Sequence, residues 1–242
     1  ENPDNVGHVT LERMAKLEPY NRWLVSRFSR SLGRRILEIG AGFGNITRHL
    51  LESDTDRPPA ELVVASDLDP VAVEYLRGAF HDEPRARVAS YAFPLSPQAL
   101  EELRALRIDS IVCCNVLEHI ERDEPTLADM LSILAPGGRL ALLVPAMHRL
   151  FGTLDEQLRH FRRYEKEELA AKLRAAGFQI EDLRFLNRPG VFGWWLNGRV
   201  LRRRVLPRGQ LRAFGLVLPF LRREEQNPPS YGMSLLAIAR KP

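Results

Sequence analysis

The sequence predicts an α/β fold with a seven-stranded, mostly parallel sheet, helices on both faces and a late antiparallel strand. Short apolar segments alternate with segments of helical spacing along residues 35–176, which is typical of a parallel sheet with right-handed crossovers. A glycine-rich turn follows the first apolar segment. Two further apolar segments near the end are separated by a long insertion, which favours a closing antiparallel pair.

The first part of the chain is expected to hold a helical segment and three strands. Residues 8–32 carry apolar side chains near helical spacing, and Pro19 would separate two helices there. Pro70 stands where a helix could begin, because proline is favoured in the first turn. The expected strands cover 35–39, 61–66 and 87–91, and a further helix covers 45–51.

The alternation continues in the middle and changes near the end. Helices are expected over 100–106 and 126–134, and strands over 109–114 and 140–144. A helix over 165–176 would be stopped by Gly177. Strands over 178–186 and 233–239 then flank a mixed segment, and they would pair with each other to close the sheet.

Composition is that of an ordinary folded protein. The chain has 242 residues, 45% of them hydrophobic and 27% charged, which suits one core with an appended lobe and argues against global disorder. The formal net charge of +4 is weak evidence for an anionic partner. The basic residues gather around Arg159–Arg163 and Arg199–Arg208.

The two cysteines and the apolar runs bear on the compartment. Cys113 and Cys114 are adjacent on a predicted strand, so they point to opposite faces and do not suit a disulfide. No Cys/His spacing resembles a zinc site, and we expect no metal. The first residues do not resemble a signal peptide, and no apolar run reaches the ~18 residues of a membrane span. We therefore expect a cytoplasmic location and no transmembrane segment.

The main chemical motif is the glycine-rich turn at residues 38–44, Glu-Ile-Gly-Ala-Gly-Phe-Gly. Glycines allow a tight turn and a close backbone approach to a ligand, and the start of the next helix could present free N–H groups. A dinucleotide fingerprint would require a further glycine at position 45, where this chain has Asn45.

Asp67 ends the second predicted strand. A carboxylate there can accept hydrogen bonds from both hydroxyls of a ribose, a role shared by several nucleotide cofactors. The alternative is that Asp67 caps the following helix. The glycine turn upstream favours ribose binding.

Several segments together resemble a known family. They read LEIGAGFGNIT, ASDLDP, NVLEHIERDE, LAPGGRLALLVPA and GTLDEQLRHFRRYEKEEL. Over residues 10–185 they resemble the class I S-adenosylmethionine-dependent methyltransferases, and more narrowly the bacterial branch called methyltransferase type 11 or type 12. The resemblance implies a Rossmann-like fold and S-adenosylmethionine as the cofactor.

The resemblance also implies roles for single residues. Glu38 would order the cofactor loop, and Asp67 would hold the ribose, with Leu68 against the adenine. His119 matches the histidine of the family's LEH run. The family usually has an aspartate after the third strand for the adenine amino group, but this chain reads Ser-Tyr-Ala-Phe over 90–93. Adenine contacts there would come from the Tyr91 ring or from backbone near Ala92. The methionine moiety and sulfonium would lie along Gly40, Ala41, Gly42, Gly44, Asn115, Val116 and Leu117.

On this basis the chain divides into four parts. We expect a helical cap over 1–32, the cofactor-binding core over 33–186, an insertion over 187–230 and the last core strand over 231–242. The insertion combines aromatic residues with arginines, and three interpretations stay open: a substrate lid, a dimer or partner surface, or a peripheral membrane contact.

Methyl transfer requires that the nucleophile, the methyl carbon and the sulfur lie in a line. When the nucleophile is a hydroxyl, a base that takes its proton also helps. His160, in the loop after the fifth strand, is the candidate base, because imidazole titrates near neutral pH. The alternative is that His160 and Tyr164 only pin this loop. His119 is expected to be structural. Arg162 and Arg163 could bind an anionic substrate or could be solvated charges.

The function predicted is methyl transfer to a small molecule, with a hydroxyl oxygen favoured, in secondary-metabolite or glycan modification. An RNA or protein substrate is a second interpretation, although we find no RNA-binding motif and expect no nucleic acid partner. A nicotinamide-dependent oxidoreductase and a non-catalytic cofactor-binding subunit are further alternatives, and a homodimer stays open.

Overall fold

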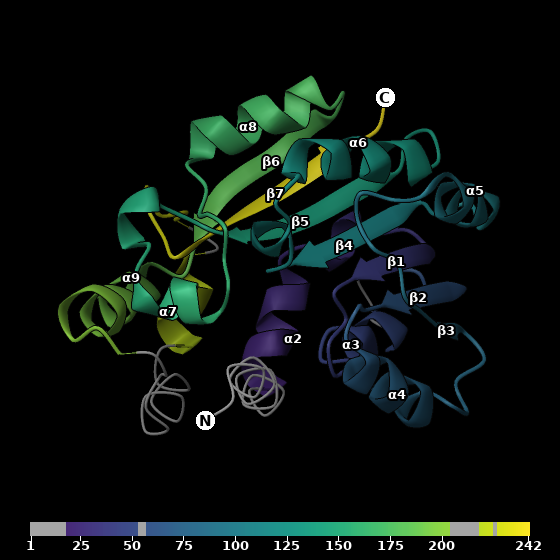
Figure 1. The fold of residues 1–242 in the computed structure, drawn as a ribbon, viewed down its shortest axis with the longest axis horizontal. Helices are drawn as coiled ribbons and strands as arrows, with labels where there is room; N and C mark the ends of the chain where they lie inside the picture. The colour runs from purple at the N-terminus through teal and green to yellow at the C-terminus, as the bar shows by residue number, and fades with distance from the viewer. Residues whose placement is uncertain (1–17, 53–56, 204–217, 225–226) are drawn as a thin grey trace.

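The strands of the computed structural model form a single sheet. The structure describes residues 18–52, 57–203, 218–224 and 227–242, and the strand order among them is β3-β2-β1-β4-β5-β7-β6 (Figure 1). β7 runs antiparallel to both β5 and β6, and the other neighbours are parallel. The predicted fold class is therefore confirmed. The strands are β1 (Arg35–Ile39), β2 (Leu62–Ser66), β3 (Ala86–Ala89), β4 (Ser110–Cys114), β5 (Arg139–Pro145), β6 (Gln179–Leu186) and β7 (Ser234–Arg240).

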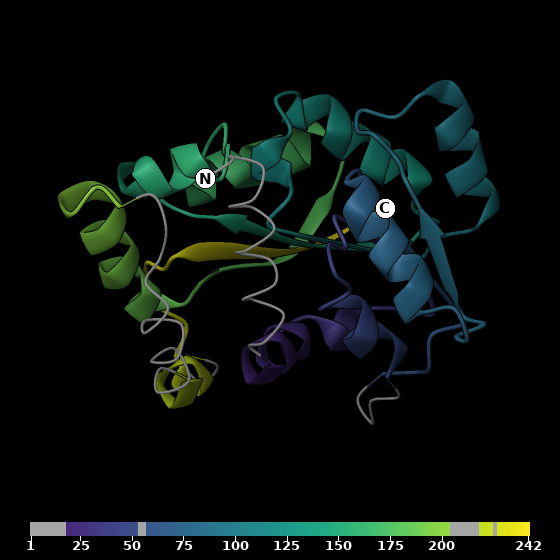
Figure 2. The ribbon, with the colours of Figure 1, turned by 60° about the horizontal axis from the view of Figure 1, so that its bottom comes forward.

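Helices cover both faces of the sheet because successive strand residues point to opposite sides. Leu37 and Ile39 of β1 pack with α5 (Pro97–Ala105), α6 (Asp123–Ile133) and α8 (Lys166–Ala175). Ile36 packs with α2 (Glu18–Ser26), α3 (Thr47–Leu51) and the helix over 218–223. Figure 2 shows these two layers with the sheet between them. The central strands β1, β2, β4 and β5 are mostly apolar and buried, as expected for a sheet covered on both sides, whereas the edge strands β3 and β6 are less buried.

Local capping residues set several helix starts. α4 (Pro70–Ala79) begins at the predicted proline, and the Asp69 side chain accepts a hydrogen bond from the Val71 N–H. α5 begins at Pro97 and not at residue 100, because Ser96 caps it. α6 begins at Asp123 and not at residue 126, and β3 ends at Ala89, two residues earlier than predicted.

The start of the chain is described only from Glu18, so most of the helical segment expected over 8–32 lies outside the described residues. Pro19 lies in the first turn of α2. The short helix η1 (Ser29–Ser31) follows before β1. No helix in the described ranges is long and apolar enough to cross a membrane.

The sheet order identifies where a ligand can bind. β1 lies between β2 and β4, so the chain leaves β1 on one side for β2 and later returns on the other side for β4. In such sheets, ligands bind beyond the carboxyl ends of the strands where the order reverses. The glycine turn follows β1, and residues 115–119 follow β4, at this position.

Candidate active site

The glycine turn is held in place by its own backbone. Gly40 and Ala41 both donate N–H bonds to the Ser66 carbonyl, at 2.8 and 3.0 Å, and Gly42 donates to the Asp67 carboxylate at 2.7 Å. These amides are therefore used within the protein, and the anion-binding helix start expected from the sequence is not formed by them. α3 begins only at Thr47, later than the predicted Asn45.

The turn also contacts the segment after β4. Gly40 has a φ of 71°, and a Cβ atom added there would collide with the Val116 side chain. A glycine is therefore needed at position 40 for both conformation and space. This close approach brings the loops after β1 and β4 together.

Asp67 links the ends of β1 and β2. One carboxylate oxygen accepts the Gly42 N–H, and the other accepts the Asp69 N–H at 2.9 Å. Because Asp69 caps α4, the capping alternative for Asp67 does not hold. A carboxylate has about four acceptor positions, so Asp67 can still accept bonds from a ligand. Leu68 beside it is 61% exposed, an apolar side chain open to a ligand.

Glu38 lies under the turn and is buried. The Thr47 hydroxyl donates to its carboxylate at 2.6 Å. Burial raises the pKa of Glu38 to about 8, since the Thr47 bond only partly offsets the loss of water and the nearby Asp67 charge adds to the rise. Glu38 therefore keeps its proton to a higher pH than an exposed glutamate does, and its bond with Thr47 supports the loop from within.

The remaining predicted cofactor residues occupy neighbouring positions. Asn115 follows β4, is exposed and has a φ of 54°, while Leu117 is buried below it. Ala92 is exposed after β3, and Tyr91 is buried in the core. Burial leaves the Tyr91 ring less suited to an adenine contact than the backbone near Ala92.

The predicted base belongs to a hydrogen-bonded network centred on Asp155. His160 Nδ1 lies 2.9 Å from one Asp155 oxygen, and Arg163 Nε donates to the same oxygen at 2.8 Å. Trp194 Nε1 donates to the other oxygen at 3.1 Å. Burial would raise the pKa of Asp155, but the bond from His160 and the charge of Arg163 lower it below its usual value. Asp155 is therefore ionised, and its carboxylate connects the side chains of His160, Arg163 and Trp194.

The same loop contacts the segment after β4. Phe161 donates its N–H to the Glu118 carbonyl at 2.8 Å, and the His119 and His160 rings meet edge to face with centroids 4.7 Å apart. The Tyr164 hydroxyl lies 3.1 Å from the Asp123 carboxylate. The loop bearing His160 thus lies beside residues 117–119. These residues directly follow Val116, which packs against Gly40 of the glycine turn.

Glu118 is fully buried, and neither of its carboxylate oxygens has a hydrogen-bond partner. Burial raises its pKa to about 8, although the Arg163 charge opposes this rise. Desolvation of the His119 ring by its neighbours, together with the adjacent His160, lowers the pKa of His119 to about 4.

The two arginines considered for an anionic substrate are engaged within the protein. Arg162 pairs with Asp123 at 3.0 Å and with the Glu121 carbonyl, and Arg163 is buried against Asp155 and the Trp194 ring. Sequence reasoning missed Asp155, Glu118 and Trp194. Asp155 has one sequence signal, an acidic residue five positions before the candidate base.

Part of the insertion packs on this loop. α9 (Arg188–Trp195) continues into a π-helix over Leu196–Val200, which packs against α7 (Thr153–Gln157). Thr153 donates its hydroxyl to the carbonyls of Gly198 and Arg203. Phe192 and Trp195 stay exposed on α9. Residues 204–217 of the insertion lie outside the described residues.

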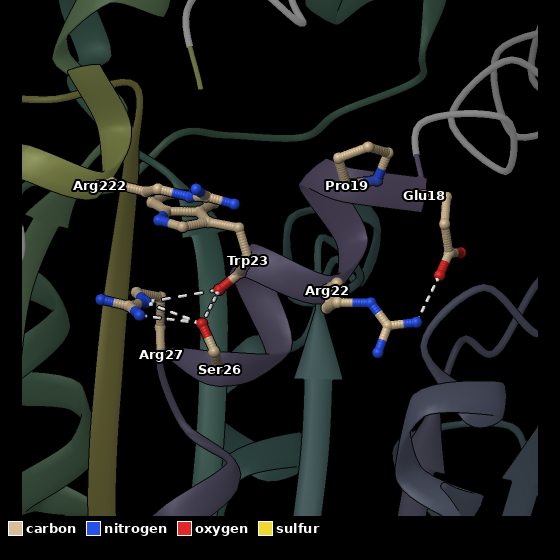
Figure 3. A pocket seen from close by; sticks show the side chains of 7 residues that line it. All are labelled: Glu18, Pro19, Arg22, Trp23, Ser26, Arg27 and Arg222. Carbon is tan, nitrogen blue, oxygen red and sulfur yellow. Dashed lines mark hydrogen bonds and ion pairs between the residues drawn. The ribbon is translucent and has the colours of Figure 1, made fainter. Parts of the chain in front are cut away.

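A separate depression lies on the α2 side of the sheet. Its volume is about 480 Å³, and it contains none of the predicted site residues (Figure 3). The Trp23 ring and the Arg222 side chain lie close together at one side of it. The lining residues are Glu18, Pro19, Arg22, Trp23, Ser26, Arg27 and Arg222.

Comparison with known proteins identifies relatives of this chain. A family model described as a methyltransferase domain matches residues 37–140. The chain is 30% identical over 183 residues to a ubiquinone biosynthesis O-methyltransferase of Xanthomonas axonopodis pv. citri, covering 69% of this chain and 72% of that protein.

Solved structures share the fold at low identity. An S-adenosylmethionine-dependent methyltransferase from Mesorhizobium loti aligns with a TM-score of 0.56 and 16% identity, over 90% of this chain and 96% of that one. A Haemonchus contortus phosphoethanolamine N-methyltransferase, solved with phosphomonomethylethanolamine and S-adenosylhomocysteine, aligns with a TM-score of 0.59 and 18% identity. This alignment covers 92% of this chain and 53% of the Haemonchus protein.

Proposed function

Because the chain belongs to the class I S-adenosylmethionine-dependent methyltransferases, with S-adenosylmethionine as its cofactor, we propose that it methylates a hydroxyl oxygen of a small molecule. The observation that carries this proposal is the contact between the loop bearing His160 and the segment after β4, which itself packs against the glycine turn.

The residues beyond β1, β2 and β4 fit the cofactor. Asp67 keeps free acceptor positions for the ribose hydroxyls, and exposed Leu68 offers an apolar surface for the adenine. Gly40, Ala41, Gly42 and Gly44 form the backbone wall for the methionine part, braced by Glu38, and Asn115, Val116 and Leu117 border the sulfonium. The cofactor supplies an electrophilic methyl group. Ala92 is the position proposed for backbone contact with the adenine.

His160 is the proposed group that activates the acceptor. Ionised Asp155 can only accept hydrogen bonds, so the proton of a neutral His160 ring resides on Nδ1 and the Nε2 lone pair is free. Nε2 can take the proton of a hydroxyl while its oxygen attacks the methyl carbon. Asp155 is a positioning residue, because it acts through His160.

The acceptor class follows from this chemistry and from the relatives. The ubiquinone biosynthesis relative carries the name O-methyltransferase, which supports an oxygen acceptor here. We infer a phenol, polyol or sugar hydroxyl of a secondary metabolite or glycan. Trp194 ties α9 to Asp155, which supports the insertion as a cover for the acceptor.

The test is transfer of labelled methyl groups to an acceptor panel of phenols, sugars, amines and thiols. The proposal expects label on hydroxyl-bearing acceptors. It also expects that His160→Ala lowers turnover at least about 100-fold, while calorimetry gives unchanged affinity for S-adenosylhomocysteine. His81→Ala, at an exposed position outside the site, is the matched control. Label only on amines or thiols, or turnover within a few-fold in His160→Ala, would refute this assignment.

A further inference from the structure

Three side chains with metal-binding atoms converge beside the proposed acceptor site. Glu118, His119 and His160 each offer a ligand atom, and these atoms all lie within 4.8 Å of one another. Glu118 and His119 come from the segment after β4, and His160 comes from the loop after β5. In the part of the chain that the structure describes, this is the one set of three such side chains whose ligand atoms lie this close together.

The Glu118 carboxylate lacks a partner that a buried acid requires. The residue is fully buried, yet both oxygens are without a hydrogen bond. Arg163 is near, but its Nε is bound to Asp155 and its Nη1 to the Ala146 carbonyl, and its Nη2 has no hydrogen-bond partner and so does not bond to Glu118. A buried carboxylate without a partner is costly, so a ligand that satisfies it would be strongly favoured.

Both histidines offer a ring nitrogen to this cluster. Asp155 holds Nδ1 of His160, which leaves the Nε2 lone pair free. A carboxylate that orients a histidine through its other nitrogen is the usual outer support of a metal-binding histidine. Asp155 is itself fixed by Arg163, Trp194 and the Gly152 N–H. His119 is partly open to solvent, so a cation there would keep positions for outside ligands.

We propose that Glu118, His119 and His160 bind one divalent cation. Two imidazoles and one carboxylate suit Zn²⁺, Mn²⁺, Fe²⁺ or Co²⁺ better than Mg²⁺, which prefers oxygen ligands. The inference deepens the proposed function, on which it rests. An acceptor hydroxyl bound to the cation would lose its proton to solvent more readily. Its oxygen would then form a bond to the methyl carbon while the carbon–sulfur bond breaks, leaving the electron pair on sulfur and S-adenosylhomocysteine as the leaving group. With the cation bound, His160 Nε2 is a ligand and the cation promotes loss of the hydroxyl proton, so the role of His160 as the base applies to the metal-free chain.

Binding is tested with the metal alone, without acceptor or turnover. The full chain is stripped with a chelator and titrated with Co²⁺ and Zn²⁺, by calorimetry and by the visible absorption of Co²⁺. We expect one equivalent per chain, with affinity lowered at least about tenfold in Glu118→Gln, His119→Ala and His160→Gln, and by about 10–100-fold in Asp155→Asn. His81→Ala should bind like the wild type.

Two results would overturn the site: absence of stoichiometric binding by the wild type, or equal affinity in wild type and all cluster variants. His119→Ala replaces a partly exposed side chain, so it keeps the test informative even where a buried variant fails to fold. Affinity for S-adenosylhomocysteine is measured in parallel. Retained cofactor binding without metal binding rejects the cation site alone. The proposed function is rejected only if the wild type, with metal supplied, transfers no labelled methyl group to any hydroxyl acceptor.

Discussion

The Asp155 carboxylate lies 2.9 Å from His160 Nδ1, and both side chains are nearly inaccessible to solvent. The same carboxylate also accepts bonds from Arg163 and from Trp194 on α9. The buried Asp155 carboxylate therefore orients His160, pairs with the buried Arg163 guanidinium, and attaches the insertion to the loop after β5 through Trp194. Substitution of Asp155 therefore allows its effect on turnover to be measured separately from its effect on stability.

Asp155→Asn is expected to lower kcat at least about tenfold and leave cofactor affinity unchanged. The amide cannot stabilise the Nδ1–H form of His160 as a carboxylate does. Breaking the buried ion pair with Arg163 should also cost about 3–5 kcal/mol of stability. Steady-state kinetics, calorimetry and urea unfolding measure these effects. Glu156→Gln, next to it and exposed, is the control. An unchanged kcat in folded Asp155→Asn would remove the positioning role.

Asp67→Asn is expected to weaken S-adenosylmethionine binding by about 10–100-fold. The substitution removes charge-assisted bonds worth about 1.5–3 kcal/mol, although an amide oxygen can still accept one backbone N–H. Calorimetry gives the affinity. Asp69→Asn is the matched control two residues away, because asparagine caps helices as well as aspartate does. Equal loss of affinity in both variants would show that the effect comes from the loop and not from the ribose contact.

Glu38 should give the cofactor-free protein a distinct pH dependence. Its pKa is about 8 in the folded state against 4.5 for an ordinary glutamate in water, so unfolding releases a proton between these pH values. Stability therefore falls as pH rises through this window, by up to about 1.4 kcal/mol per pH unit from this group. In Glu38→Gln this contribution is absent. Urea unfolding at several pH values between 5 and 9 compares the two slopes; parallel curves would contradict the prediction.

Gly44→Ala should destabilise the protein more than Gly137→Ala. The two glycines have nearly the same φ, 74° and 75°, so both alanines carry a similar conformational cost of about 1–2 kcal/mol. A Cβ at Gly44 would lie 2.7 Å from the Phe80 ring, whereas one at Gly137 meets nothing within 4 Å. Crowding should add about 1–3 kcal/mol at Gly44. Urea unfolding measures both, and equal losses would refute the steric argument.

Much of the core could be predicted because its signals are local. β1 was predicted at its observed bounds from one apolar run, and Pro70 marked the start of α4. The late pairing of β6 with β7 also followed from order along the chain. The predicted helix starts lie after Pro97 and Asp123, because the first turns of these helices contain few apolar residues and the apolar periodicity begins later. The roles of the predicted site residues stay predictions.

The sequence by itself determined the order of strands and helices, the glycine turn and the identity of Asp67, since each depends on neighbours in the chain. Only the tertiary structure decided that Asp155 orients His160, that Glu118 is buried without a partner, and that Trp194 reaches the same acid from 39 residues away. These relationships depend on burial and on contacts between separate loops. Burial raises the free-energy cost of a charged side chain, and a local sequence pattern does not indicate which distant side chain will pair with that charge.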